Sequence, residues 1–356
     1  MAAGRRGPAR RYTPRVFLAE SIVHTCDRFL FRIHGEFGIR WYGTAYAVGF
    51  LLAWWLVRWL GRTGRIRLSA SSAGDLVTVL AVGVLAGGRL GHIVFYEPNL
   101  LVDFSRSFPF WAVFDLPRGG MSSHGGIIGV GLACAWFARR RRLPALAIGD
   151  IACFVAPYGL GLGRIANWIN GELAGKVLPA SAQADPPWWS VKYPEEMLTK
   201  DFVNAHRLTE LEWMRTQLGV GPRVPLAQAL HDACYRHDAE VIAKVAPLLT
   251  ARYPINFMQA FTDGVVLPAI LVVAWWRPRP SGWIVGWFML GYGLLRLVTE
   301  QYRVPDPDIL PDTGVTLPMV LSVVMALVGV ALLAARRKGE RLYGGVRPGG
   351  VVSPDA

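Results

Sequence analysis

The sequence feature that most constrains the fold is an apolar run at residues 315–335, VTLPMVLSVVMALVGVALLAA. These 21 residues include no ionisable side chain, and about 20 apolar residues in a helix are enough to cross the hydrocarbon core of a bilayer. Arg336, Arg337 and Lys338 follow at once. The run therefore predicts a membrane-spanning helix that ends at a charged surface.

Further apolar segments extend this prediction to most of the chain. Composition agrees with it, because 53% of the residues are hydrophobic and the mean hydropathy is +0.31, values that are unusual for a soluble protein of this length. We expect an all-α integral membrane protein with about seven transmembrane helices. The other six lie at about 42–60, 75–97, 121–138, 146–166, 256–276 and 281–299.

Basic residues predict the orientation of these helices. The net charge of +13 is carried in short clusters between apolar runs and not along one surface, which argues against nucleic-acid binding. Because Lys and Arg favour cytoplasmic loops, we expect the amino terminus outside and the carboxyl terminus inside. The clusters follow the first, third, fifth and seventh helices, at 58–67, 139–142, 277–279 and 336–341.

The amino-terminal segment opposes this orientation. Its first fifteen residues contain five arginines, Arg5, Arg6, Arg10, Arg11 and Arg15, which normally resist translocation. We interpret them as a tolerated exception or as a sign of an upstream start codon. Residues 16–37 are too polar for a span and lack the apolar core of a signal peptide, so we expect an interfacial helix there.

The predicted spans divide the chain into five parts. A long outward-facing insertion separates spans four and five, and we expect it to form a periplasmic helical head with amphipathic helices at about 195–218 and 225–250. The parts are a basic interfacial segment 1–40, a transmembrane core 41–175, the head 176–252, a second transmembrane core 253–338 and a cytoplasmic tail 339–356.

Two features of the head allow more than one interpretation. HDACYRHD places His231, Cys234 and Asp238 on one helical face, which fits either metal ligation or a solvated polar face. No fourth ligand is evident, so we predict no metal. Cys26 and Cys234 both face the outer side, where they can form a disulfide or remain free.

Polar residues within the apolar spans carry the functional signal. A charged side chain at the bilayer centre costs about 2.5–3.5 kcal/mol even on insertion scales. Two groups recur at helical spacing, so that each shares one helix face. They are Arg164, Asn167 and Asn170 in the fourth span, and Arg296, Glu300 and Arg303 at the end of the sixth; Arg89 and His92 repeat the spacing in the second.

These groups fit either of two roles. One is interhelical pairing, in which each arginine is neutralised by a nearby glutamate or asparagine. The other is binding of an anion, since guanidinium groups grip phosphate through two parallel hydrogen bonds. Several arginines at similar depth, together with His124 in the glycine-rich GGMSSHGGIIG, favour an anionic lipid headgroup.

At these residues the chain resembles the prolipoprotein diacylglyceryl transferase family. GRIANWINGELAG, residues 163–175, fits the family signature G-R-x-(G or A)-N-(aromatic)-x-N-x-E-x-x-G at every fixed position. Four other stretches match in the family's order: WYGTAYAVGF at 41–50, GGRLGHIVFY at 87–96, RGGMSSHGGIIGV at 118–130 and RLVTEQYRVPD at 296–306.

The resemblance implies a reaction without a cofactor in the bacterial inner membrane, with the active site toward the periplasm. The diacylglyceryl group of phosphatidylglycerol, a membrane lipid, passes to the lipobox cysteine in the signal peptide of a prolipoprotein. A thioether forms and glycerol phosphate is released. The residues implied to be catalytic are Tyr42, His124, Arg164, Asn167, Glu172 and Arg296, and those implied to bind substrate are Arg89, Arg164, Asn170, Gly175, Arg296, Glu300 and Arg303.

Each residue type suits a step of this chemistry. A peptide thiol has a pKa of about 8.5 and needs a base or a positive field to ionise, and His124 fits either a base or a donor to the headgroup. Arg164 and Arg296 suit the charge that develops on the leaving phosphate. We expect Asn167 and Glu172 to orient the arginines or the lipid glycerol, and Tyr42 to hydrogen-bond the headgroup.

One stretch departs from the family pattern. Where the family commonly has R-H-P-S-Q-x-Y-E, this chain has RYPINFMQAFTDG at 252–264, with Tyr253, Ile255, Asn256, Met258 and Gln259 in place of the usual types. An inactive or altered-specificity family member is therefore an alternative. A transporter of an anion is a further one, although no internal repeat of the kind many transporters have is evident.

Overall fold

The computed structural model describes residues 21–34, 37–107, 109–115, 120–205, 211–305, 313–337 and 342–347. The chain divides into two compact units. We call Asp27–Gly175 with Ile255–Ala356 the helical body, and Met1–Cys26 with Lys176–Pro254 the head. Each unit is described by itself below.

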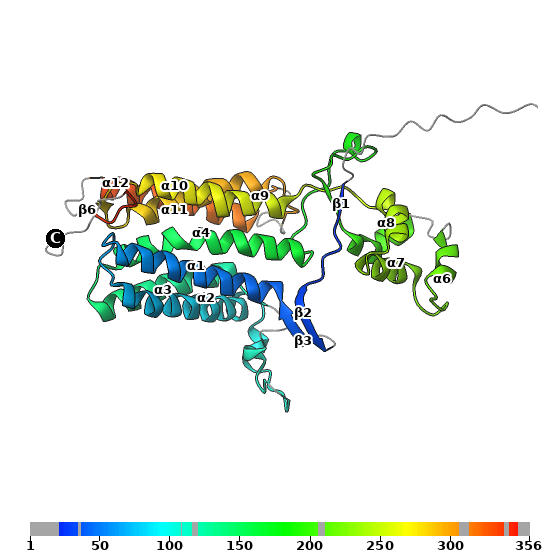
Figure 1. Ribbon diagram of the computed structural model, residues 1–356, viewed down its shortest axis with the longest axis horizontal. Coiled ribbons are helices and arrows are strands. Elements are labelled where there is room, and N and C mark those ends of the chain that lie inside the picture. Colours follow the sequence, from blue (N-terminus) through cyan, green and yellow to red (C-terminus); the bar gives the residue numbers. More distant parts are fainter. Residues whose placement is uncertain are drawn as a thin grey trace, which may run out of the picture. The chain divides into compact units, whose positions relative to one another are not determined.

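The helical body contains every helix that the apolar runs predict. They are α1 (Trp41–Arg62), α2 (Ala73–Phe95), α3 (Ser123–Arg141), α4 (Ala145–Ile169), α11 (Trp283–Glu300) and α12 (Leu317–Arg336), together with a composite helix formed by α9 (Ile255–Phe261), a π-helical turn (Thr262–Val266) and α10 (Leu267–Ala274). Figure 1 shows them running alongside one another within the body. The closest pairs are α2 with α3, α11 with α12, and α1 with α4.

Five of these helices are long and apolar enough to cross a membrane, counted over the residues that the structure describes. They are Trp41–Arg62, Ala70–Val94, Ala145–Ile169, Ile255–Ala274 and Leu317–Arg336. The remaining two, α3 and α11, have 19 and 18 residues. The body is therefore that of a multi-pass membrane protein built almost entirely from helices.

The outer surface of the body is apolar. Large hydrophobic side chains such as Leu51, Leu132, Val273 and Leu327 are exposed on α1, α3, α10 and α12. A soluble domain rarely exposes so much contiguous apolar surface, whereas a helix that contacts lipid does. The exposure pattern agrees with the membrane assignment from the sequence.

Glycines explain why α2 and α3 pack so closely. Gly83, Gly87 and Gly91 lie four residues apart on α2 and face Gly125 and Gly129 on α3. A Cβ atom on Gly83 would lie 2.7 Å from the carbonyl oxygen of Gly129, closer than real Cβ atoms approach. Small residues at this spacing let two backbones touch, so the glycine-rich stretch that carries His124 is also a helix-packing surface.

A buried aspartate fixes the start of α11. Asp150 of α4 is 1% exposed and accepts hydrogen bonds from the backbone N–H groups of Gly282, Ile284 and Val285 at 2.7, 2.9 and 3.0 Å. These N–H groups have no partner within the helix, and a carboxylate at a helix N-terminus also interacts favourably with the helix dipole. The contact joins α4 to α11 at the end of the body opposite to Arg164 and Arg296.

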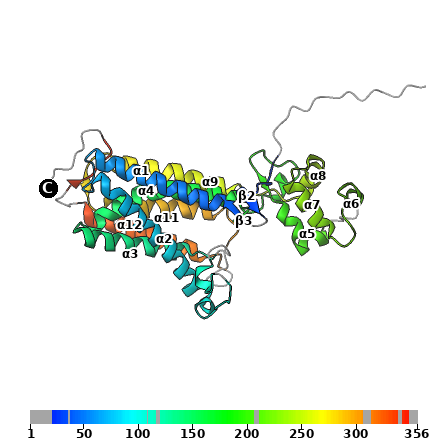
Figure 2. The same cartoon turned by 60° about the horizontal axis from the view of Figure 1, so that its bottom comes forward.

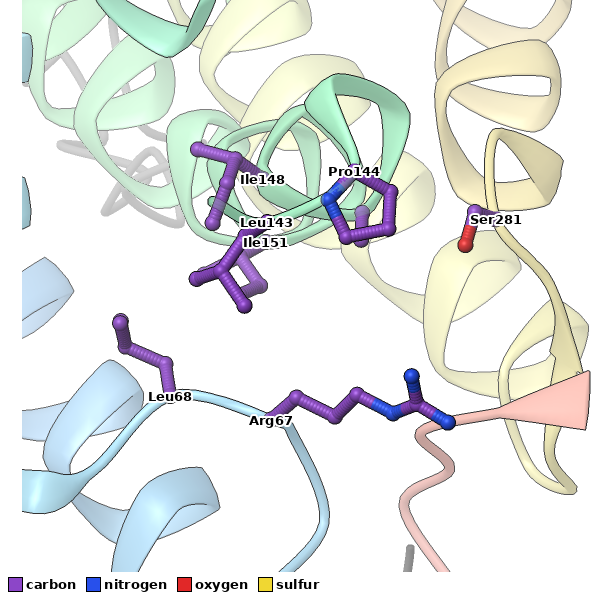
Figure 3. Close-up of a pocket in the computed structure, with 8 residues that line it drawn as sticks. Arg67, Leu68, Leu143, Pro144, Ile148, Ile151 and Ser281 are labelled. Atoms are coloured by element: carbon purple, nitrogen blue, oxygen red, sulfur yellow. The ribbon is translucent and has the colours of Figure 1, made fainter. Parts of the chain in front are cut away.

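A small cavity of about 50 Å³ lies at this same end. Figure 3 shows it between the segment Arg67–Leu68 and the start of α4. Its lining is mostly apolar, and Ser281 precedes the glycine that Asp150 contacts. None of the site residues predicted from the sequence lines this cavity, so it is distinct from the site described below.

The helix expected over residues 16–37 is wrong in the part that the structure describes. Phe29–His34 (β2) and Phe37–Arg40 (β3) pair as an antiparallel hairpin that leads directly into α1. Phe31, Ile33 and Ile39 are exposed on it. Alternating apolar residues suit a strand better than a helix, and the expectation overlooked this period.

The head is a small, mainly helical unit with its own core. Figure 2 shows α5 (Lys200–Ala205), α6 (Trp213–Gln217), α7 (Leu226–Tyr235) and α8 (Ala239–Val245) grouped together. Met197, Leu230, Ala233, Cys234 and Val241 are buried between these elements. The strand β1 (Ile22–Val23) pairs in parallel with β4 (Val191–Lys192), so residues close to the amino terminus belong to the head.

The two long amphipathic helices expected in the head are shorter than predicted. The segment 225–250 is broken at His237, which has a φ of 60°, and Asp238 begins α8 by accepting hydrogen bonds from the N–H groups of Glu240 and Val241. His231, Cys234 and Asp238 therefore do not share one helix face. In the described residues no group of three potential metal ligands forms.

The cysteines are free thiols in this structure, Cys26 and Cys234 included. Burial raises the pKa of the Cys234 thiol to about 11, with smaller contributions from Asp238 and Glu195. The disulfide that the sequence allowed is not formed.

We expect all four thiols to react with a chromogenic disulfide reagent when the protein is unfolded without reductant, because no pair is bridged. In the folded protein at pH 7.5, Cys234 should react far more slowly, since only roughly one thiol in three thousand is ionised when the pKa is near 11. Thiol titration before and after unfolding measures both. A count of two thiols after unfolding would contradict the structure.

Candidate active site

Three side chains at the end of α11 form a charged ladder. Arg296 Nη2 lies 2.8 Å from Glu300 Oε2, and Arg303 Nη1 lies 3.5 Å from Glu300 Oε1. The Glu300 side chain is 1% exposed. The sequence spacing predicted that the three residues share a helix face, and this is confirmed for Arg296 and Glu300 only. Arg303 lies beyond the end of α11 and meets the same carboxylate from the segment that follows.

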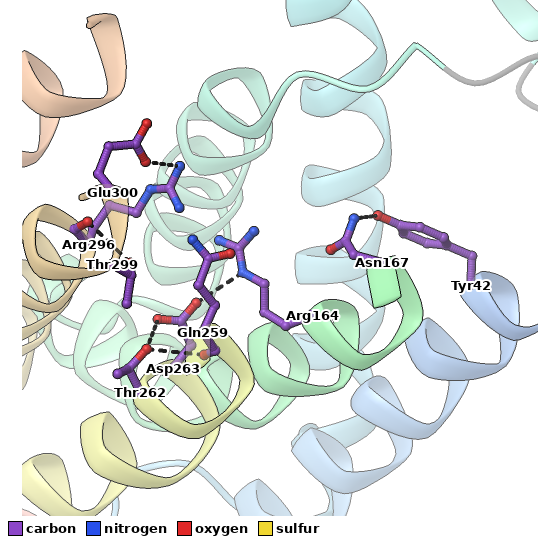
Figure 4. A network of polar contacts seen from close by, with 9 residues as sticks. All are labelled: Tyr42, Arg164, Asn167, Gln259, Thr262, Asp263, Arg296, Thr299 and Glu300. Atoms are coloured by element: carbon purple, nitrogen blue, oxygen red, sulfur yellow. Dashed lines mark hydrogen bonds and ion pairs between the residues drawn. The ribbon is translucent and has the colours of Figure 1, made fainter. Parts of the chain in front are cut away.

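A second buried ion pair joins α4 to the π-helical turn. Arg164 Nε donates to Asp263 Oδ2 at 3.1 Å, and the Asp263 side chain is 4% exposed. The Thr262 hydroxyl also contacts Asp263, at 3.5 Å. Figure 4 shows this pair beside the Arg296–Glu300 pair, with the side chains of α4, α9 and α11 turned toward one another.

The two pairs form one electrostatic unit. The guanidinium groups of Arg164 and Arg296 are close enough to repel each other, and Asp263 attracts both. Three guanidinium groups, including that of Arg303, are set against the two carboxylates of Asp263 and Glu300. Guanidinium groups gathered in this way suit the binding of an anion.

A second polar network, made of Tyr42, Asn167, Asn170 and Glu172, lies on the other side of Arg164 along α4. Asn167 Nδ2 donates to the Tyr42 hydroxyl at 2.8 Å and approaches Glu172 Oε2 at 3.3 Å. Asn170 Nδ2 lies 3.3 Å from Glu172 Oε1. The sequence predicted that Asn167 and Glu172 orient the arginines or the lipid glycerol; in the structure they bond Tyr42 and one another.

The signature's last residues connect the two networks. After α4 ends, Gly171 has a φ of 71°, a left-handed conformation that favours glycine. The chain then returns so that Gly175 pairs with Arg303 in a short antiparallel bridge. Gly175 thus acts through its backbone, by holding the segment that carries Arg303 against the signature.

Arg89 has a different environment from the other predicted arginines. It is 7% exposed, and it donates to the carbonyl oxygens of Ala112, Val113 and Gly120, the last two at 2.8 and 3.1 Å. These bonds tie α2 to the loop that precedes α3. The side chain holds a loop in place, and its predicted contact with substrate stays a prediction.

His124 occupies the second position of α3, but its side chain lies outside the described residues. The start of α3 is well defined, because the Ser122 hydroxyl accepts a hydrogen bond from the N–H group of Gly125 at 3.2 Å. Ser122 also donates its own N–H to the carbonyl oxygen of Gly88 on α2. The backbone that carries His124 is therefore fixed by the packing of α2 against α3.

The sequence analysis missed three polar residues on the composite helix. Asn256, Gln259 and Asp263 are each 1–2% exposed, and Asn256 Nδ2 donates to the carbonyl oxygen of Glu172 at 2.9 Å. They lie in the stretch that departs from the family pattern. The signal was present, because polar residues at helical spacing in an apolar run need partners, as they do in the other spans.

The fold and the charge pattern together define a class. It is a multi-pass membrane protein that gathers arginines and buried carboxylates at one end of its helices, an arrangement that suits an anionic ligand.

Comparison with known proteins identifies the family within this class. The profile of the prolipoprotein diacylglyceryl transferase family matches residues 28–335, and the chain belongs to that family. It is similar to the phosphatidylglycerol–prolipoprotein diacylglyceryl transferase of Bdellovibrio bacteriovorus, at 38% identity over 342 residues, or 90% of this chain and 96% of that protein. The enzymes of the same name from Rhodospirillum rubrum and Proteus mirabilis are each 33% identical, over 86% of this chain and 92% and 90% of their own.

We expect Asp263→Asn to lower the free energy of unfolding by about 3–5 kcal/mol, because it leaves the buried Arg164 without its counter-charge. Asp75→Asn is a matched control. It breaks an ion pair with Arg141 whose side chains are 58% and 44% exposed, and such pairs contribute at most about 1 kcal/mol. Thermal unfolding of both variants in the same detergent gives the two changes in melting temperature. Equal changes would contradict the role of Asp263 as the counter-charge of Arg164.

Proposed function

We propose that this protein transfers the diacylglyceryl group of phosphatidylglycerol to the lipobox cysteine of prolipoproteins. Membership of the family supports the reaction, and the relatives' names state the same donor and acceptor. The observation that carries the assignment to this site is the group of arginines gathered around two buried carboxylates, in which Arg296 Nη1 is buried without a hydrogen-bond partner among the described residues. The phosphodiester of phosphatidylglycerol is a singly charged anion that such guanidinium groups can bind.

Arg164 and Arg296 hold the phosphate in this proposal. Asp263 uses Arg164 Nε, which leaves the two terminal nitrogens of that guanidinium for the ligand. Glu300 similarly uses Arg296 Nη2, and Arg296 Nη1 is buried without a hydrogen-bond partner among the described residues. The carboxylates thus orient the two guanidinium groups, and their own negative charges are neutralised by the arginines and do not repel the phosphate.

The transfer is a substitution at carbon. The thiolate of the lipobox cysteine attacks the diacylglycerol carbon that bears the phosphate, a C–S bond forms, and the C–O bond to phosphate breaks. Glycerol phosphate leaves with the electron pair, and the thiol proton passes to a base. Arginines fixed in advance stabilise the charge that grows on the leaving oxygen, and an apolar surrounding strengthens this effect.

In this proposal the second polar network borders the leaving group. Tyr42 is held by Asn167, so its hydroxyl is positioned to donate to the headgroup while accepting from the amide. Glu172 is held by two asparagine side chains, one of which also bonds Tyr42. His124 retains the two roles that the sequence allows, a base for the thiol or a donor to the headgroup.

The direct experiment incubates the purified protein with phosphatidylglycerol and a lipobox peptide. Mass spectrometry should detect a thioether-linked diacylglyceryl peptide, and glycerol phosphate should appear in equal amount. An altered family member or a transporter would bind the lipid without forming this product.

We further propose seven spans in the bacterial inner membrane, with the active site and the head toward the periplasm. The carboxyl ends of α1, α3, α10 and α12 lie at one end of the helical body (Figure 1), and arginines are clustered at or directly after them in the sequence. This charge asymmetry supports a cytoplasmic location for that end. The polar networks lie at the other end.

Reporters fused after Arg141 and Arg279 should therefore read as cytoplasmic, and one fused near Arg215 should read as periplasmic. Paired fusions of alkaline phosphatase and a fluorescent protein give opposite signals on the two sides. A cytoplasmic signal near Arg215 would overturn both the seven-span arrangement and the orientation of the site.

We expect Arg164→Lys to lose about as much activity as Arg164→Ala, on the order of 10- to 100-fold in kcat/KM, the equivalent of one charged hydrogen bond. Lysine keeps the charge, but it cannot bond Asp263 and grip phosphate with two parallel donors at once. Arg62→Lys, at an exposed position at the carboxyl end of α1, is the control and should leave kcat/KM unchanged. Near-normal turnover in Arg164→Lys would mean that only charge matters.

A further inference from the structure

Gln259 on α9 is a buried amide whose polar atoms make no hydrogen bond within the part of the chain that the structure describes. The residue is 1% exposed, and neither Oε1 nor Nε2 has a partner within the described residues. Leaving one such group unsatisfied costs about 1–3 kcal/mol, and folded proteins rarely tolerate it. A side chain that could instead be leucine or methionine therefore retains an amide for a reason other than packing.

The position of Gln259 indicates what it meets. It precedes Asp263 by four residues, and Figure 4 shows its side chain on the same side of the helix, directed toward the guanidinium groups of Arg164 and Arg296. Arg296 Nη1 is also buried without a hydrogen-bond partner among the described residues. The π-helical turn directly after α9 adds to the case, since such turns are frequent at functional sites.

The hydrogen-bonding properties of an amide limit which functional groups the ligand can carry. The arginines only donate hydrogen bonds, so they suit the oxygens of a phosphate. An amide both donates and accepts, and its Oε1 needs a hydroxyl or N–H donor. A ligand that satisfies both Gln259 atoms and Arg296 Nη1 together carries a phosphate oxygen and a hydroxyl close by.

We propose that Gln259 forms a hydrogen bond with a hydroxyl of the lipid headgroup next to the phosphate. It thereby selects a lipid with a polyol phosphate headgroup over a phosphodiester without hydroxyls. The inference rests on the proposed function for the identity of the lipid. It adds a specificity-determining residue: the arginines supply affinity for any phosphodiester, and the amide distinguishes among them. Oε1 accepts from the hydroxyl, and Nε2 donates to a phosphate oxygen.

Two lipids that differ only in the headgroup hydroxyls test this. Phosphatidylglycerol and phosphatidylpropanol have the same charge, phosphodiester and acyl chains, but the second has no headgroup hydroxyl. Binding is measured as thermal stabilisation of the full-length protein in detergent that contains increasing amounts of each lipid. The transfer rate to a lipobox peptide is measured with the same preparations.

The wild-type protein should bind phosphatidylglycerol about tenfold more tightly than phosphatidylpropanol, the equivalent of one net hydrogen bond. Gln259→Leu should lose this preference by weakening only phosphatidylglycerol. Gln259→Glu keeps an acceptor oxygen and removes the donor, so it should keep the preference while binding both lipids less well. Gln217→Leu, at an exposed glutamine of the head, should change neither value.

The outcomes separate the inference from the function on which it rests. If Gln259→Leu weakens both lipids equally, or neither, the residue has only a structural role and the inference is wrong. If the wild-type protein shows the preference in binding and loses it in Gln259→Leu, but forms no thioether, the inference stands and the proposed transfer is wrong. If the wild-type protein transfers from both lipids equally well and binds them equally, headgroup reading is excluded.

Discussion

The structure depends on how charged side chains are neutralised inside an apolar helical body. An arginine in such a place is tolerated only when a partner offsets the loss of water. Arg164 meets Asp263, and Arg296 and Arg303 share Glu300. Each carboxylate is buried together with the arginine that it neutralises, so the fold holds these guanidinium groups in fixed positions. The same pairing that lets the arginines be buried thus also orients them for the proposed anionic ligand.

Two helices set the register of this site. Asp150 and Arg164 both lie on α4, 14 residues or roughly 20 Å apart along the helix. Asp150 binds the N-terminus of α11, and Arg296 lies near the other end of that helix. Fixing the two helices together at Asp150 limits how far one can slide against the other. The distance between Arg164 and Arg296 is therefore controlled from the far end of the body, by three hydrogen bonds to one buried carboxylate.

The sequence predicted the parts of this fold that depend on local pattern. Long apolar runs specify helices, and the spacing of Arg296 and Glu300 placed them on one face of α11, whereas Arg303 lies beyond the end of that helix. Breaks within short amphipathic segments were not predictable in the same way. The head helix over 225–250 ends at His237 because Asp238 caps the next helix, and a capping aspartate within a charged run resembles any solvated residue. The strands β2 and β3 were missed because the helix expectation ignored their alternation.

The sequence predicted the site residues of α4 and α11 but not those of the composite helix at 255–274, because their partners are distant in the sequence. Motif spacing identifies residues that follow one another along the chain, so it found the arginines and the signature, but the partner of Arg164 lies 99 residues further on. Asn256, Gln259 and Asp263 are spaced along one helix and buried among apolar neighbours, and such residues must meet polar groups from elsewhere. The stretch 252–264 therefore still contributes polar side chains to the site, although its sequence departs from the family pattern. Asp263 supplies the charge that Arg164 requires, and Gln259 places a neutral amide beside the two arginines.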